Sequence, residues 1–154
     1  RVLLLDEPLA ALDPLARREF LKSLLDSAGA TAMTVVLSSH LIGELARVCD
    51  HLIVIRDGRV RLAGELDELL SEHRLVTGVT EATVRMPAGT EVVTRSSHER
   101  HTTLLVRTRG ALLNPALTAS PVDLEALVLA YLEQPSDQAR ESRISRIVPE
   151  GRSA

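Results

Sequence analysis

The chain has 154 residues, enough for one ordinary domain or for a small domain with an appended unit. Hydrophobic residues make up 45% of it and charged residues 25%, which is typical of a globular protein. A net charge of -3 gives no basis for a nucleic-acid surface, and no apolar run approaches the ~20 residues that span a bilayer.

The first third of the chain has the pattern of a strand, a helix and a second strand. Residues 2–5 form an apolar run typical of a strand that is buried on both faces. Asp13 and Pro14 are the residue types expected at the N-cap and the first position of a helix, and the helical period of apolar residues continues to about residue 28. A second apolar run covers 34–37. This order predicts a parallel pair of strands with the helix as the crossover.

The next segment continues with alternating short elements. We expect a second helix over 42–49 and a third strand over 52–55. Asp57-Gly58 predicts a tight hairpin turn, because both residue types tolerate positive φ. A strand over 60–63 and a short helix over 65–70 should follow.

Composition changes after about residue 76. Segments rich in Thr and Val predict a small antiparallel sheet, and Ser120-Pro121 is expected to cap a closing helix. The three segments are 79–86, 90–95 and 102–108. The predicted domains are therefore 1–75 for an α/β unit, 76–134 for an appended β-rich unit with its closing helix, and 135–154 for a disordered tail.

Two adjacent acids, Asp6 and Glu7, directly follow the first strand. Open α/β sheets bind ligands at the carboxyl ends of their strands, and Asp6 could hold Mg²⁺ there, since this ion prefers oxygen ligands. Neighbouring residues of a strand face opposite ways, so Glu7 would be free to orient and deprotonate an attacking water. The alternative is that two acids merely end a strand before a turn.

His40 lies shortly after the strand predicted over 34–37. A single histidine in such a place also has a purely structural interpretation. Because the carboxyl ends of parallel neighbours lie together, His40 can converge on one ligand with Asp6 and Glu7, and this favours a functional role.

The stretch "LLLDEPLAALDP", with a serine pair and His40 one helix and one strand later, resembles the ATP-binding-cassette (ABC) ATPases. The resemblance implies that Asp6 is the magnesium-associated aspartate of the Walker B motif and Glu7 the catalytic glutamate. It implies that His40 contacts the γ-phosphate and that Asp13 lies in the D-loop at a dimer interface. The cofactors it implies are ATP and Mg²⁺. The fold it implies is α/β, the C-terminal part of a P-loop NTPase parallel sheet, followed by a small α+β unit.

The phosphate-binding motifs of that family are missing. A Walker A motif needs G-x-x-x-x-G-K-[ST], but Lys22 is the only lysine and has no such glycines around it. The glycine-rich signature is absent as well. We therefore expect the C-terminal part of a nucleotide-binding subunit, which is inactive alone but whose complete form couples ATP hydrolysis to transport.

The β-rich unit that ends in "VDLEALVLAYLEQ" resembles the appended part of exporter-type subunits that serve ABC-2 membrane proteins. This implies export, a transmembrane permease subunit and a second nucleotide-binding subunit as partners, and a cytoplasmic location on the inner face of the plasma membrane. No nucleic-acid partner is expected. Two alternatives stay open: an ABC-type ATPase of DNA repair or translation, and a non-catalytic interaction module.

Overall fold

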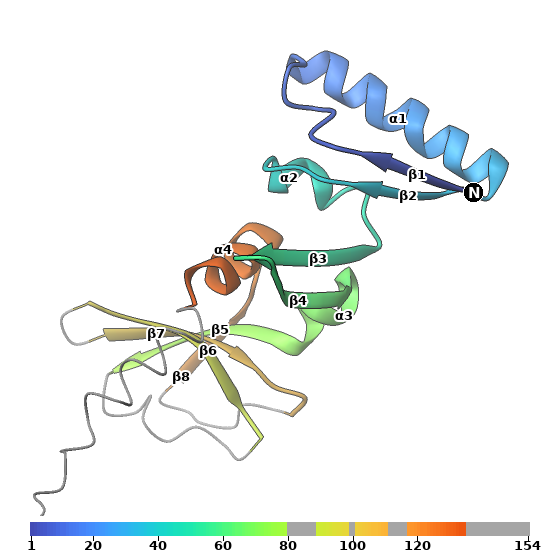
Figure 1. Cartoon of the computed structure of the whole chain (residues 1–154). Helices are drawn as coiled ribbons and strands as arrows, with labels where there is room; N and C mark the ends of the chain where they lie inside the picture. The colour runs from blue at the N-terminus through green and yellow to red at the C-terminus, as the bar shows by residue number, and fades with distance from the viewer. Residues whose placement is uncertain (80–88, 99–100, 111–116, 135–154) are drawn as a thin grey trace, which may run out of the picture. The chain divides into compact units, whose positions relative to one another are not determined.

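The computed structural model describes residues 1–79, 89–98, 101–110 and 117–134. It contains two compact units, Arg1–Asp50 and a second that begins at His51 (Figure 1). The predicted tail, 135–154, lies outside the described residues. The domain boundary expected at 75/76 stays a prediction, because a division by packing does not test where an ATPase core ends. Within the described ranges, no helix combines the length and hydropathy that crossing a bilayer requires.

The first unit is built on the predicted parallel pair. Strands β1 (Val2–Leu5) and β2 (Thr34–Leu37) pair in parallel from Val2↔Thr34 to Leu5↔Leu37. Helix α1 (Pro14–Thr31) connects them and runs alongside the pair (Figure 1). The short helix α2 (Ile42–Leu45) follows and ends four residues before the predicted end. The mixed α/β class is confirmed.

Helix α1 begins where the sequence predicts and ends later. The Oδ1 of Asp13 accepts hydrogen bonds from the backbone N–H groups of Leu15 and Ala16, at 2.9 and 3.0 Å. The helix runs past the predicted end at about residue 28, to Thr31. Ala32 takes the left-handed conformation at φ 46° and closes the helix with a backbone bond to Ala28.

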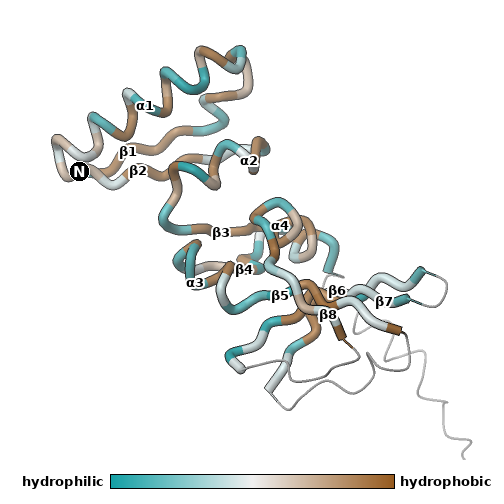
Figure 2. The backbone as a smooth tube through the Cα atoms, turned by 180° about the vertical axis from the view of Figure 1, so that it is seen from behind, coloured by the Kyte–Doolittle hydropathy of each residue, from teal (hydrophilic) through white to brown (hydrophobic). Residues whose placement is uncertain are grey.

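The β1–β2 pair is apolar on both faces but covered on only one (Figure 2). Leu3 and Leu5 are half-buried. On the other face Val2, Leu4 and Val36 are 68%, 75% and 45% exposed, and we call these three residues the open face. Parallel sheets normally have both faces covered, whereas the described residues leave the open face exposed.

The second unit starts with a hairpin that the sequence predicts. Strands β3 (His51–Arg56) and β4 (Arg59–Glu65) pair antiparallel, and β3 belongs to a different sheet from β2. Asp57 and Gly58 have φ values of 52° and 69°, as a two-residue turn with two positive φ angles requires. Helix α3 (Leu66–Glu72) follows and runs slightly past its predicted end.

A four-stranded antiparallel sheet in the order β6-β7-β5-β8 comes next. The sequence predicts its strands β6 (Glu91–His98) and β7 (His101–Arg107). Strand β5 (His73–Val79) was not predicted, and the segment predicted over 79–86 lies, beyond Val79, outside the described residues. Strand β8 (Leu117–Pro121) was not predicted.

Helix α4 (Leu124–Glu133) closes the second unit and packs on β3, β4 and β6. The predicted cap at Ser120-Pro121 is wrong, since both residues belong to β8. Asp123 is the N-cap instead, and its Oδ1 accepts the N–H of Ala126 at 2.7 Å. The closing helix itself is confirmed.

Candidate functional site

The candidate site lies at the carboxyl end of the parallel pair. Asp6 and Glu7 directly follow β1, and Ser38 directly follows β2. The backbone N–H of Ser38 donates to the carbonyl of Leu5 at 2.9 Å, which extends the parallel ladder by one bond. This bond places Ser38 opposite the two acids.

The hydroxyl of Ser38 connects both acidic residues. It donates to the Oδ1 of Asp6 at 2.6 Å, and it accepts the backbone N–H of Glu7 at 2.9 Å. Hydrogen bonds to an ionised carboxylate are among the stronger ones in proteins. The predicted acids are therefore held by a side chain that directly follows the neighbouring strand.

Glu7 has a left-handed backbone with φ 46°. Such a conformation costs a non-glycine residue about 1–3 kcal/mol and persists only where surrounding contacts enforce it. The carbonyl of Glu7 also accepts the N–H of Ala10 at 3.2 Å, so a turn starts here. The reason given from the sequence, that Asp6 and Glu7 alternate along a strand, is wrong, because β1 ends at Leu5 and the turn sets their directions.

Glu7 and His40 are joined directly. The Nδ1 of His40 lies 2.7 Å from the Oε2 of Glu7. An ionised carboxylate can only accept, so Nδ1 carries the proton in this contact and Nε2 is the ring nitrogen left for another partner. The side chain of His40 is 65% exposed and that of Glu7 is 40% exposed, so both reach solvent at this edge of the sheet.

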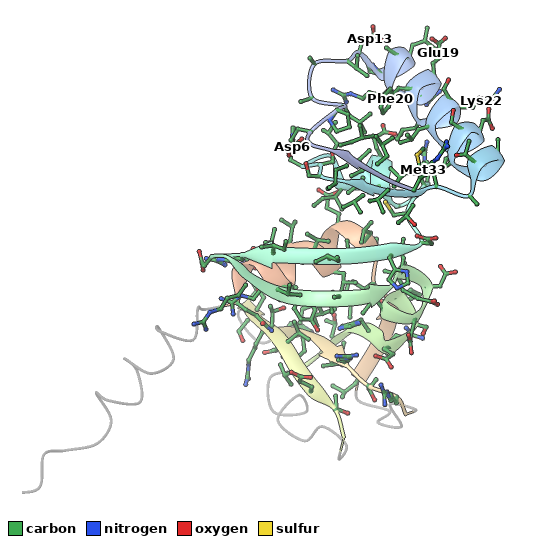
Figure 3. All side chains as sticks on the ribbon, turned by 45° about the vertical axis from the view of Figure 1, so that its right-hand side comes forward. Asp6, Asp13, Glu19, Phe20, Lys22 and Met33 are labelled. Atoms are coloured by element: carbon green, nitrogen blue, oxygen red, sulfur yellow. The ribbon has the colours of Figure 1, made fainter. Side chains whose placement is uncertain are left out.

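Asp13 lies away from these groups, at the start of α1, whereas Asp6 lies at the strand end (Figure 3). The loop between them is anchored by Leu9, which is buried and whose carbonyl accepts from the Nε of Arg17 at 3.3 Å. Asp13 acts as a helix cap, and no interaction described in the structure joins it to Asp6. Lys22 lies exposed on α1 (Figure 3).

The donor set fits a magnesium ion that is shared with a phosphate ligand. No group of three His, Cys, Asp or Glu side chains among the described residues could hold a metal ion by itself. Asp6 uses Oδ1 for Ser38 and keeps its second oxygen, while Glu7 is engaged with His40. Since Mg²⁺ commonly takes one or two carboxylates together with substrate phosphates and water, Asp6 alone suits such a site.

Ser38 is the member of the site that sequence reasoning missed. The serine pair before His40 contributed to the resemblance, but neither serine received a role. The available signal was a hydroxyl at the end of one strand, beside two acids at the end of its expected parallel neighbour.

Comparison with known proteins found no matching family model. The chain is 43% identical over 70 residues to the thiamine import ATP-binding protein ThiQ of Escherichia coli (strain UTI89 / UPEC), covering 46% of this chain and 30% of that protein. It is 33% identical over 157 residues to the molybdenum import ATP-binding protein ModC of Rhizobium meliloti (strain 1021), covering 100% of this chain and 41% of that protein.

The chain thus spans less than half the length of these relatives. Both relatives are named for import, so they do not support the export direction expected from the β-rich unit. The alignment with ModC runs through that unit as well. The homologues of this chain are ATP-binding subunits of ABC transporters.

Proposed function

We propose that this chain carries the hydrolytic side groups of an Mg²⁺-dependent ATPase site in an ABC transporter subunit. The observation that supports this most is the linked set Asp6–Ser38–Glu7–His40 at the carboxyl end of a parallel strand pair. A metal-binding carboxylate, a base and a phosphate-facing imidazole are the groups that phosphoryl transfer to water requires.

Each residue has a separate role in the proposal. Asp6 would hold Mg²⁺, which neutralises charge on the phosphate oxygens. Glu7 accepts a proton from the attacking water through Oε1, since Oε2 is taken by His40. His40 orients Glu7 through Nδ1 and presents Nε2 to the γ-phosphate. The side chains of Glu7 and His40 are both open to water in the described structure.

The exposure of Glu7 and His40 indicates that other residues must cover the site and bind the phosphates. Phosphoryl transfer depends on positioning and on the exclusion of bulk water, and this chain has no glycine-rich loop with a lysine. We propose that the Walker A and signature motifs come from other parts of the assembly, and that Asp13 lies at the contact with a second nucleotide-binding subunit. A transmembrane permease would be the other partner, on the cytoplasmic side of the membrane.

The direction of transport, import or export, is the next part of the proposal. The names of the relatives and the alignment with ModC over the whole chain favour import. Export remains the second candidate, on the pattern of the β-rich unit that closes on α4. Reconstitution with the permease in vesicles separates the two by the side from which cargo stimulates ATP turnover. The relatives give no support to a role in DNA repair or translation.

Replacement of Glu7 tests the proposal in a complete subunit that contains this chain. Glu7→Gln keeps the size of the side chain and removes the base, so ATP turnover should fall by roughly 10²–10⁴-fold while ATP binding is retained. Glu19→Gln is the matched control, because Glu19 is exposed on α1 and away from the site (Figure 3). Near-normal turnover by Glu7→Gln would remove Glu7 from the proposed role.

A further inference from the structure

We infer that Ser38 is a positioning residue that sets the geometry of both carboxylate-bearing residues of the site. The inference rests on the proposed function, because it assigns Ser38 to the same reaction. Ser38 would not touch the nucleotide. Its effect would pass through Asp6 and Glu7, which its hydroxyl connects.

The backbone of Ser38 is well anchored for this task. Its N–H donates to the carbonyl of Leu5 at 2.9 Å, immediately after the paired residues Leu5 and Leu37. A side chain at the end of a paired strand is held more precisely than one in a free loop. The hydroxyl, at the end of β2, therefore holds the two acidic residues that follow β1 in a fixed position.

The single hydroxyl serves two different purposes. As a donor to the Oδ1 of Asp6, it fixes the rotation of that carboxylate and leaves the second oxygen for a cation. As an acceptor for the N–H of Glu7, it stabilises the residue with φ 46°, whose left-handed backbone is otherwise costly. Loss of the hydroxyl would release both groups together.

The neighbouring residue Ser39 provides a matched comparison. Its hydroxyl accepts the backbone N–H of Leu41 at 3.0 Å, in the segment that leads into α2. No described contact joins Ser39 to Asp6 or Glu7. Of the two adjacent serines, Ser38 therefore contacts both acidic residues, and Ser39 has no described contact with either.

Steady-state kinetics of the complete subunit give the first test. Ser38→Ala should lower kcat roughly 10- to 100-fold, as expected for loss of hydrogen bonding to a charged group, with little change in the KM for ATP. Ser38→Thr keeps the hydroxyl at an exposed position and should recover most of the rate. Ser39→Ala should leave kcat within about twofold. Equal losses in Ser38→Ala and Ser39→Ala would overturn the inference.

Hydrogen exchange of the Glu7 amide gives a second test that does not depend on activity. Ser38→Ala should speed exchange of this N–H, while Ser38→Thr and Ser39→Ala should not. Unchanged exchange in Ser38→Ala would overturn the inference, as would faster exchange with full turnover. Failure of the proposed function is recognised separately, because Glu7→Gln would then retain turnover whatever the Ser38 variants do.

Discussion

The hydrogen bond between His73 and Tyr131 allows a sharp test of what stabilises the second unit. His73 is fully buried, and its Nδ1 contacts the carbonyl of Leu69 in α3 at 2.6 Å. Its Nε2 lies 2.9 Å from the hydroxyl of Tyr131 in α4. One imidazole therefore joins α3, β5 and α4. Tyr131→Phe removes the hydroxyl and keeps the ring.

The expected cost follows from this geometry. In neutral His73, Nδ1–H donates to Leu69, so Nε2 is an acceptor, and among the described residues the Tyr131 hydroxyl is its only donor. Tyr131→Phe leaves this buried nitrogen without a donor, which should lower the free energy of unfolding by about 1–2 kcal/mol. The ring stays in its edge-on contact with His73, at 5.7 Å between centroids, so little packing is lost.

Acidification should destabilise the same contact. Burial lowers the pKa of His73 below its ordinary value of 6.5, although the hydrogen bond to Leu69 opposes the shift; the charge of Arg107 lowers it further, and those of Glu72 and Glu91 raise it. The unfolded chain therefore binds a proton more readily than the folded one. The stability that neutral His73 provides is complete above about pH 6.5 and is lost as the pH falls below that value.

Urea denaturation followed by far-ultraviolet circular dichroism provides the measurement. At pH 8, Tyr131→Phe should shift the midpoint down by about 0.5–1.5 M. His51 is exposed, so His51→Gln should keep the loss of stability between pH 6.5 and 5, whereas His73→Gln should reduce it. An unchanged midpoint in Tyr131→Phe, or the same pH dependence in both histidine variants, would refute the reasoning.

Three further predictions follow from the described contacts. Asp13→Ala should destabilise α1 by about 1 kcal/mol, whereas Asp13→Asn should keep the cap, and equal thermal melts of the two variants would contradict the cap. Loss of dimer formation in Asp13→Asn, in which the cap is intact, would separate the proposed interface role from capping. Hydrogen bonds from Arg107 and Arg109 lower the pKa of Glu72, so Glu72 contributes stability above about pH 4.5 that is lost at lower pH; Glu72→Gln should abolish this acid loss in a pH series of denaturation curves. The 154-residue chain alone should not bind Mg-ATP in calorimetric titration, and micromolar binding would contradict this by revealing a phosphate site within the chain.

Features with local chemical causes could be predicted from the sequence. The cap at Asp13, the turn at Asp57-Gly58 and the apolar run of β1 each depend on a few neighbouring residues. Because two short parallel strands with a helix between them have few alternative arrangements, the grouping of Asp6, Glu7 and His40 at one edge could be predicted as well.

Features that depend on distant pairing could not be predicted. Strand β8 ends in Pro121, a residue that argues against a central strand but is tolerated because, among the described strands, β8 pairs with β5 alone, at the sheet edge. Strand β5 contains Gly78, which weakens a strand pattern. The left-handed turn at Glu7 depends on a hydroxyl 31 residues away, and no local preference of glutamate indicates it.

The bond between His40 and Glu7 offers the most direct test of the proposed site. If the two side chains act as one unit, as their 2.7 Å contact implies, their individual losses should not multiply. The measurement is ATP turnover in a complete subunit containing this chain, for Glu7→Gln, His40→Ala and the double variant. Our account predicts a large loss in each single variant and a double variant no more than about threefold slower than Glu7→Gln. Full multiplication of the two losses, or normal turnover in His40→Ala, would contradict it.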